Sequence, residues 1–309
     1  MNDSAAFVTK IRDALRPGSL GASWPTPLEA APPLGAAIGV DELWLKREDR
    51  AGGNKVRGLE FLMAGARPGT VFVTLGGTGS THCLATARGA RVLGCRAAMA
   101  LFPQPETEAT RAITAELERT ALVVRAPVKI ALPWAVLRAW TAAGRFGAAR
   151  RWIPGGGAAP PAVAGHVLAG LELEHQMAAP PDTIVVPLGT GGTAAGIALA
   201  VAWLRWPTRI VAVRVAPRIV ANRWRTLRLA RRAAALIGIS PGALALDIVN
   251  GLGRGYGYPS AAGERARQLA ASHGVRLDPT YGAKAFAAIG QRGTGTGRRV
   301  VFWHTFPWP

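Results

Sequence analysis

Short runs of apolar residues alternate along the chain with longer segments of helical periodicity. Almost wholly apolar runs are typical of strands buried on both faces of a sheet. The pattern predicts such strands at Val71 to Leu75, Thr183 to Leu188, Arg209 to Val215 and Arg298 to Trp303. An alanine-rich segment from Leu84 to Leu93 predicts a helix. This alternation indicates an α/β fold in which helices cover largely parallel sheets.

Two of the predicted strands end in a glycine-rich turn that leads into a helix. Residues 76–82 follow the first strand, and residues 189–192 follow the second. The stretch 183–204 carries no charge and is about as long as a membrane-spanning helix. Pro187 and the glycines after it interrupt that stretch, so we predict a strand, a turn and a helix that begins near Thr193, and no membrane span.

Length and composition favour two domains. The chain has 309 residues, of which 49% are apolar and 18% charged, so it can bury a large core. Glycine and proline accumulate between Arg151 and Pro161, where a helix cannot continue, and we place a domain boundary there. We expect a larger domain of residues 1–52 and 162–309, and a smaller inserted domain of residues 53–161.

The chain is strongly basic, with 37 basic and 18 acidic residues and a formal net charge of +19. Such a charge would suit a nucleic-acid binder. The arginines are scattered, however, apart from a cluster between Arg223 and Arg232 that has the spacing of one helix with a solvated basic face. We therefore keep nucleic-acid binding only as a minor alternative. An anionic partner or a subunit contact is the alternative role for the arginine cluster.

The two cysteines, Cys83 and Cys95, cannot build a disulfide framework, and neither has the spacing of a metal site. We expect no metal. The first residues, MNDSAAFVTKIRDAL, lack the apolar core of a secretory signal. Both observations predict a cytoplasmic protein.

Lys55 is the strongest candidate for chemistry. It lies in the segment WLKREDRAGGNKVRGLEF, after two glycines and an asparagine and near the start of a predicted helix. A solvated surface lysine would be an ordinary occupant of this position. A buried lysine with a lowered pKa could instead form a Schiff base with an aldehyde and transfer protons. The motif alone leaves both interpretations open.

The second candidate is the loop formed by Gly189, Thr190, Gly191, Gly192 and Thr193. Between a strand and a helix, bare backbone N–H groups and the helix dipole can hold a phosphate. The loop lacks the lysine of a P-loop and the spacing of the dinucleotide fingerprint. A purely structural turn is the alternative.

Together these two signals resemble the fold type II, tryptophan-synthase-like pyridoxal-phosphate enzymes, and among them the D-cysteine desulfhydrase and aminocyclopropane-carboxylate deaminase family. The likeness covers PTPLEAAPPLGAAIGVDELWLKREDRAGGNKVRGLEF, IPGGGAAPPAVAGHVLAGLELEHQM, PLGTGGTAAG, GYGYP, LDPTYGAKAF and VVFWHT. It spans nearly the whole chain, although residues 104–150 match poorly. The resemblance implies two α/β domains, each a mostly parallel sheet flanked by helices, with the cofactor phosphate bound by the larger domain.

The resemblance also implies roles for single residues. Lys55 matches the lysine that binds pyridoxal 5'-phosphate and later moves the substrate's alpha proton. Ser80 would meet the substrate carboxylate, and Tyr256 and Tyr281 match aromatic hydroxyls near cofactor and substrate, although either tyrosine could be a plain core residue. The cofactor-binding residues that it implies are Lys55, Asn54, Thr81, Gly189, Thr190, Gly191, Gly192, Thr193 and Thr305.

Four residues at three places in the chain depart from the family pattern. Thr81 stands where an asparagine usually contacts the pyridoxal ring hydroxyl, and Gly282 replaces a larger residue. Thr305 remains as a partner for the ring nitrogen, but Phe306 and Pro307 replace the usual glycine pair after it. We expect an altered cofactor pocket, in which a neutral hydroxyl at the ring nitrogen favours elimination and Gly282 disfavours opening of a cyclopropane ring.

The first hypothesis is therefore a pyridoxal-phosphate-dependent carbon–sulfur lyase or deaminase. It would remove a beta substituent from a small amino acid such as D-cysteine and release ammonia and a keto acid. A racemase or another elimination on the same fold is an alternative, and so is a non-catalytic relative that binds the cofactor or a partner. The family resemblance suggests a homodimer. His82 and His304 lie beside the motifs, and we take them first as structural residues.

Overall fold

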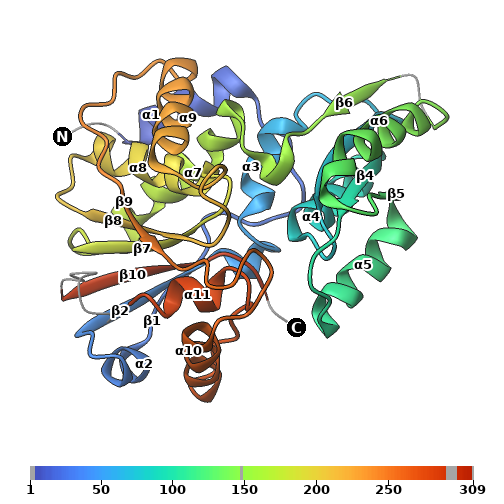
Figure 1. The fold of residues 1–309 in the computed structure, drawn as a ribbon. Coiled ribbons are helices and arrows are strands. Elements are labelled where there is room, and N and C mark those ends of the chain that lie inside the picture. Colours follow the sequence, from blue (N-terminus) through green and yellow to red (C-terminus); the bar gives the residue numbers. More distant parts are fainter. Residues whose placement is uncertain (1–3, 147–148, 290–297, 308–309) are drawn as a thin grey trace. The chain divides into compact units, whose positions relative to one another are not determined.

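The computed structural model describes residues 4–146, 149–289 and 298–307 (Figure 1). Helices alternate with strands along the chain, and nearly all neighbouring strands are parallel, so the predicted α/β class is confirmed. The described helices include none that is both long enough and apolar enough to cross a membrane.

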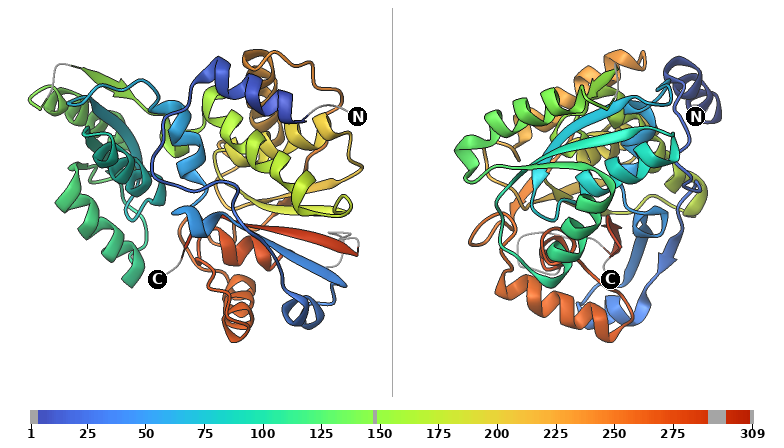
Figure 2. Two further views of the ribbon diagram at one scale, coloured as in Figure 1. Left: turned by 180° about the vertical axis from the view of Figure 1, so that it is seen from behind. Right: turned by 90° about the vertical axis from the view of Figure 1, so that its right-hand side faces the viewer.

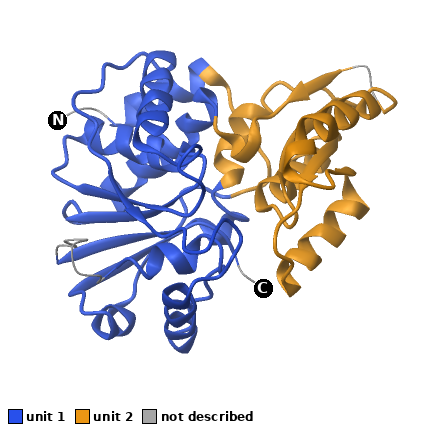
Figure 3. Ribbon diagram, viewed as in Figure 1, with its two compact units in different colours: residues 1–14, 23–54, 159–309 blue, residues 15–22, 55–158 orange. Residues whose placement is uncertain are grey.

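The chain divides into two compact units, each with its own sheet (Figure 3). Unit 1 comprises residues 1–14, 23–54 and 159–309, and unit 2 comprises residues 15–22 and 55–158. This division rests on compactness, and a compact unit is not the same as a domain that folds by itself. The expected division into domains of residues 1–52 with 162–309 and of residues 53–161 therefore stays a prediction.

Unit 1 holds a six-stranded sheet in the order β1-β2-β10-β7-β8-β9, in which only the β1–β2 pair is antiparallel. Its strands are β1 (Leu28–Ala30), β2 (Glu42–Arg47), β7 (Thr183–Leu188), β8 (Arg209–Arg214), β9 (Asp247–Asn250) and β10 (Arg299–His304). Its helices are α1 (Ser4–Leu15), α2 (Pro32–Ala37), α7 (Pro160–Gln176), α8 (Gly192–Leu204), α9 (Arg223–Leu236), α10 (Ala261–Ser272) and α11 (Gly282–Phe286). A 3-10 turn, η1 (Glu48–Ala51), follows β2.

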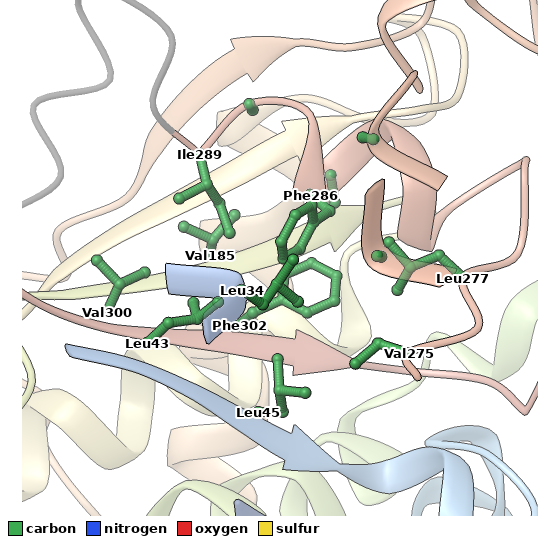
Figure 4. Close-up of a cluster of buried hydrophobic side chains, with 14 of the residues drawn as sticks. Leu34, Leu43, Leu45, Val185, Val275, Leu277, Phe286, Ile289, Val300 and Phe302 are labelled. Atoms are coloured by element: carbon green, nitrogen blue, oxygen red, sulfur yellow. The ribbon is translucent and has the colours of Figure 1, made fainter. Parts of the chain in front are cut away.

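The core on one face of this sheet lies under α2, α10 and α11 (Figure 4). Val300 and Phe302 of β10 point into it, and the Phe302 ring meets the Phe286 ring edge to face at a centroid distance of 5.2 Å. The alternate residues Val301 and Trp303 are also fully buried. Because side chains of a strand alternate between faces, β10 is covered on both, which explains its continuous apolar run.

Helices α7 and α8 lie on the opposite face from α10 and α11, as Figures 1 and 2 show from several sides. They approach closely because both carry glycine at the contact. A Cβ atom on Gly170 would lie 2.4 Å from Cβ of Ala200, and one on Gly196 would lie 2.3 Å from Cβ of His166. Larger residues would separate the helices and shift the amino-terminal end of α8.

Unit 2 holds a parallel sheet of four strands in the order β5-β4-β3-β6. The strands are β3 (Val71–Gly77), β4 (Arg96–Phe102), β5 (Leu122–Arg125) and β6 (Arg150–Trp152), and the helices are α3 (Lys55–Leu62), α4 (Thr81–Val92), α5 (Glu108–Thr120) and α6 (Leu132–Ala143). Three buried alanines of α6 pack on β3 and β4, at Ala135, Ala139 and Ala143. Two 3-10 turns complete the unit, η2 (Lys129–Ala131) and η3 (Gly155–Gly157).

Between residues 151 and 161, where we placed a domain boundary and expected no helix to continue, the structure has regular elements at both ends. Strand β6 ends there, and α7 begins at Pro160. Proline is tolerated in the first turn of a helix because the N–H that it lacks would have no intrahelical acceptor. The arginine cluster forms α9 with Arg225, Arg228 and Arg232 exposed, so the predicted solvated basic face is confirmed.

A buried polar network joins β2 to α7. Lys46 is fully buried, and its Nζ donates to Glu172 Oε2 at 2.5 Å, to Gln176 Oε1 at 2.9 Å and to the Thr26 carbonyl at 2.8 Å. The Thr26 hydroxyl donates to Glu48 Oε1 at 2.6 Å, and Glu48 is also fully buried. The network therefore fixes the chain from the end of β2 into η1.

Replacing Glu172 with alanine removes the carboxylate that neutralises the buried Lys46 ammonium. Because an uncompensated buried charge is costly, we expect the free energy of unfolding to fall by about 3–5 kcal/mol, measured by urea denaturation. The control is Glu118→Ala, which breaks an ion pair with Arg125 whose side chains are about half exposed, and should cost less than about 1 kcal/mol. Equal losses in both variants would contradict the importance of the network.

Candidate active site

Asn54 connects three parts of unit 1. Its backbone N–H donates to the Thr305 carbonyl at 2.8 Å, at the end of β10. Its side-chain Nδ2 donates to Thr193 Oγ1 at 2.7 Å, in the first turn of α8. Gly53 before it has a φ of +103°, and a Cβ there would lie 3.0 Å from the Phe306 ring. Glycine is therefore required, and Phe306 packs directly on the chain that leads to Lys55.

The loop between β7 and α8 has the geometry of an anion site. Gly191 has a φ of +93°, and a Cβ there would lie 2.8 Å from Thr226 Oγ1. The first backbone N–H groups of any helix lack an intrahelical acceptor, and no side chain of the described residues caps this end of α8. These free donors and the helix dipole fit the phosphate group of pyridoxal phosphate.

The two predicted tyrosines meet each other. Tyr281 directly precedes α11, Tyr256 lies in the loop after β9, and their hydroxyl groups share a hydrogen bond. The two rings are edge to face with centroids 6.0 Å apart. A Cβ on Gly189 would lie 3.3 Å from Tyr281 Cε1, so this ring also lies against the glycine loop. Both tyrosines are partly exposed and neither is a plain core residue.

Asp278 holds the Tyr281 turn, and the sequence interpretation missed it. Its carboxylate accepts backbone N–H groups from Thr280 at 3.1 Å, Tyr281 at 2.7 Å and Gly282 at 2.8 Å. Burial raises the pKa of Asp278, and these N–H groups act in the opposite direction. A Cβ on Gly282 would lie 2.9 Å from Asp278 Oδ2, so glycine at this position accommodates the carboxylate. An aspartate followed by a turn could have been recognised from sequence.

Lys284 holds the loop that carries Tyr256. Its Nζ donates to the carbonyls of Leu252 at 2.8 Å and Gly255 at 3.2 Å. Burial lowers the pKa of Lys284. Nothing in the sequence pointed to this lysine as a site residue. Its acceptors are backbone carbonyls, which every residue has and which therefore leave no pattern in the sequence.

Lys55 is the first residue of α3 and therefore follows Asn54 by one peptide bond. Its Nζ donates to the Gly156 carbonyl in η3 at 3.2 Å. Desolvation by burial lowers the pKa of Lys55 from an ordinary 10.5 to about 8. Near neutral pH a far larger fraction of this amine is uncharged than of an exposed lysine, which supports the reactive interpretation.

Ser80 and Thr81 begin α4. Ser80 is the N-cap residue, and its Oγ accepts the Cys83 backbone N–H at 3.3 Å. The Gly76 position has no room for a side chain, since a Cβ there would lie 2.4 Å from Ser80 Oγ. Thr81 is partly exposed at the same helix end. Lys55, Ser80 and Thr81 thus belong to unit 2, whereas the glycine loop, the tyrosines and Thr305 belong to unit 1.

His304 has a structural setting. It lies buried near the end of β10, with its Nδ1 3.3 Å from Asp49 Oδ1. Burial lowers the pKa of His304, while the Asp49 carboxylate raises it. The imidazole thus contacts η1, directly before the segment that leads to Lys55.

Comparison with known proteins gives a consistent result. Residues 20–305 match the family model described as pyridoxal-phosphate dependent enzyme. The chain is 34% identical to nocardicin C-9' epimerase of Nocardia uniformis subsp. tsuyamanensis over 278 residues, covering 84% of this chain and 85% of that one. It is 32% identical to D-cysteine desulfhydrase of Salmonella choleraesuis over 302 residues, covering 91% of each.

A solved structure described as an ACC deaminase homologue has a TM-score of 0.83 and 27% identity, and the match covers 96% of this chain and 94% of that one. The fold and the cofactor expected from the resemblance are thereby confirmed. The matched range includes Lys55, the glycine loop and Thr305. The chain therefore belongs to the family of pyridoxal-phosphate dependent enzymes.

Proposed function

We propose that this enzyme removes a beta substituent from a small amino acid of the D-cysteine type and releases ammonia and a keto acid. One observation carries the proposal. The side chain of Asn54 is bonded to Thr193 of the glycine loop, and the next residue along the chain is a lysine whose amine has a pKa of about 8. The desulfhydrase relative, which matches over nine-tenths of both chains, supports the choice of reaction.

The residues that would hold the cofactor are those that the family resemblance implies. The backbone N–H groups of the loop from Gly189 to Thr193 would bind the phosphate, and the Lys55 amine would bind the aldehyde carbon. Asn54, which directly precedes Lys55 in the chain, would anchor the end of this segment to the loop through its bond to Thr193. Thr305, whose carbonyl accepts the Asn54 N–H, would offer its hydroxyl to the ring nitrogen.

Pyridoxal phosphate, when bound, supplies an electron sink that stabilises negative charge at the substrate's alpha carbon. Lys55 Nζ takes the alpha proton. With a pKa of about 8, roughly one-tenth of this amine is uncharged at pH 7 and can accept a proton, which is a far larger fraction than for an ordinary lysine. The Gly156 carbonyl holds Nζ during this exchange. Loss of the beta substituent then needs a proton donor for the leaving group.

The remaining site residues would bind and orient the substrate. The start of α4 offers backbone N–H groups and the Ser80 hydroxyl to the substrate carboxylate. The hydrogen-bonded hydroxyls of Tyr256 and Tyr281 would stand near the leaving group, where one can supply a proton while the other keeps it oriented. Thr81 at the ring hydroxyl would give a weaker hydrogen bond than the amide of an asparagine.

A second candidate function is epimerisation at the alpha carbon, which the similarity to nocardicin C-9' epimerase favours. Both reactions begin when Lys55 takes the alpha proton. They differ in the next step, because an epimerase returns a proton to the opposite face and the carbon skeleton stays intact. A homodimer, a cytoplasmic location and the absence of nucleic-acid partners also remain proposals for this chain.

Lys55→Ala should abolish the lysine-bound cofactor. We expect wild type with added pyridoxal phosphate to show an absorption band that borohydride reduces, and mass spectrometry should find the reduced cofactor on the Lys55 peptide. The variant should show free cofactor only. A wild-type protein without this band would leave a non-catalytic relative as the better description.

The same preparations distinguish elimination from epimerisation. D-Cysteine and L-cysteine are incubated in deuterated buffer, and keto acid, sulfide and deuterium at the alpha carbon are measured. Elimination predicts keto acid and sulfide in equal amounts. Deuterated, racemised substrate without keto acid would support the epimerase instead.

The rate at which the apo-protein captures pyridoxal phosphate should rise with pH, because the Lys55 amine must lose its charge first. Only the uncharged amine attacks an aldehyde, so the rate rises with pH and reaches half its maximum near pH 8. At pH 7 it should be roughly one-tenth of the plateau, whereas an ordinary lysine would still be accelerating above pH 10. Stopped-flow absorbance with the apo-protein measures this profile.

Gly191→Ala should weaken binding of the phosphate. An L-residue at a φ of +93° is strained by about 1–2 kcal/mol, and the new Cβ would also meet Thr226 Oγ1. The free loop relieves this strain by leaving its phosphate-binding geometry, and binding must then restore that geometry. Since about 1.4 kcal/mol is tenfold in Kd, we expect the Kd for pyridoxal phosphate to rise about tenfold in an absorbance titration. Gly39→Ala is the matched control, because Gly39 also has a positive φ but has open space around it. An equal effect in both variants would argue against the loop as the phosphate site.

A further inference from the structure

His82 is a buried group that the proposed chemistry does not use. It lies in the first turn of α4, two residues after Ser80, and only 4% of its surface is exposed. Its Nε2 lies 2.9 Å from Thr74 Oγ1 on β3. Its other ring nitrogen, Nδ1, is buried and has no hydrogen-bond partner among the residues that the structure describes.

The neighbours of Thr74 determine which ring nitrogen carries the proton. The Thr74 hydroxyl donates its single hydrogen to the Ile153 carbonyl at 2.8 Å. It can therefore only accept from His82, so Nε2 carries the hydrogen and Nδ1 is a bare acceptor. Burial, followed by repulsion from Lys55, lowers the pKa of His82 to about 3. The ring is thus neutral near neutral pH, and Nδ1 remains an acceptor there.

The same glycine turn contacts His82 and Lys55. A Cβ on Gly157 would lie 3.7 Å from His82 Nδ1 and 3.6 Å from Cε1, so the Nδ1 edge of the ring faces η3. The carbonyl of the preceding residue, Gly156, accepts from Lys55 Nζ. A buried acceptor without a donor is destabilising, and Lys55 is the donor-bearing side chain whose charge acts on this imidazole.

We infer that His82 is a positioning residue for Lys55, whose released ε-amino group donates one hydrogen to the Gly156 carbonyl and another to His82 Nδ1. This inference rests on the proposed role of Lys55 as the cofactor lysine. When Nζ takes the alpha proton, the C–H bond breaks and a third N–H bond forms. Two of the three N–H groups are then hydrogen-bonded to the Gly156 carbonyl and to His82 Nδ1, and the third can return its proton to the substrate or product.

The consequence for Lys55 can be measured without turnover. An acceptor stabilises the ammonium form more than the neutral amine, so its removal should lower the pKa of Lys55 relative to wild type. Competitive labelling of the apo-protein with acetic anhydride across a pH series reports this pKa, because only neutral amines react, and mass spectrometry of the Lys55 peptide gives the extent.

Two substitutions separate the two nitrogens of the ring. His82→Gln can still donate to Thr74 but has no acceptor at the Nδ1 position, whereas His82→Asn places an amide oxygen near that position and does not reach Thr74. We expect His82→Gln to raise the acid dissociation constant of Lys55 about tenfold, and His82→Asn to stay within about threefold of wild type. In the holoenzyme, the acid limb of the plot of kcat against pH should move to lower pH for His82→Gln.

Nitrogen-15 NMR tests the tautomer directly and needs no variant of His82. The wild-type spectrum should show an unprotonated Nδ1 whose resonance moves in Lys55→Ala, where its donor is lost. A protonated Nδ1, no movement in Lys55→Ala, or an unchanged Lys55 pKa in His82→Gln would each overturn the inference. The proposed function would survive those results if the borohydride-reducible band on Lys55 is present, and it would fail on its own if that band is absent.

Discussion

A buried ammonium group needs acceptors in place before the chain around it can pack, and Lys46 imposes this requirement on unit 1. Its partners come from α7 and from the segment before β1, so β2 can occupy its position only when those elements are also present. Removing such a charge from water costs several kcal/mol unless it is paired. The pairing therefore couples β2 and α7 in one cooperative arrangement, and the Thr26–Glu48 bond extends that arrangement into η1.

The chain that leaves this network reaches the candidate chemistry within a few residues. Gly53 donates its N–H to the Glu48 carbonyl, and Asn54 is held by Thr305 and Thr193. Lys55 therefore starts α3 directly after two residues whose N–H groups and side chain are hydrogen-bonded. Positioning of this kind is valuable for a catalytic amine, because an error of about 1 Å in a reacting group can cost a factor of about 100 in rate.

The sequence predicted the strands that are buried on both faces, such as β7, β8 and β10, because their composition is continuously apolar. It did not predict β6, since a three-residue edge strand of sequence RRW carries no such signal. Lys55 and the glycine loop could be proposed from the sequence because residue type and order mark them. Gly156, Lys284 and Thr74 could not be proposed in this way. Gly156 acts through its backbone carbonyl, and Lys284 and Thr74 donate to backbone carbonyls that are distant in the sequence.

The arrangement of donors and acceptors also bears on the choice between elimination and epimerisation. Both need a lysine that takes and returns a proton, and a pKa of about 8 suits either. Elimination further requires a proton at the leaving group, which two hydrogen-bonded tyrosine hydroxyls can supply, whereas epimerisation requires an acid on the face of the alpha carbon opposite the lysine. Asp278 and Lys284 fix both tyrosines through backbone contacts. A hydroxyl pair held by these contacts fits the single proton delivery to the leaving group in the elimination that we propose.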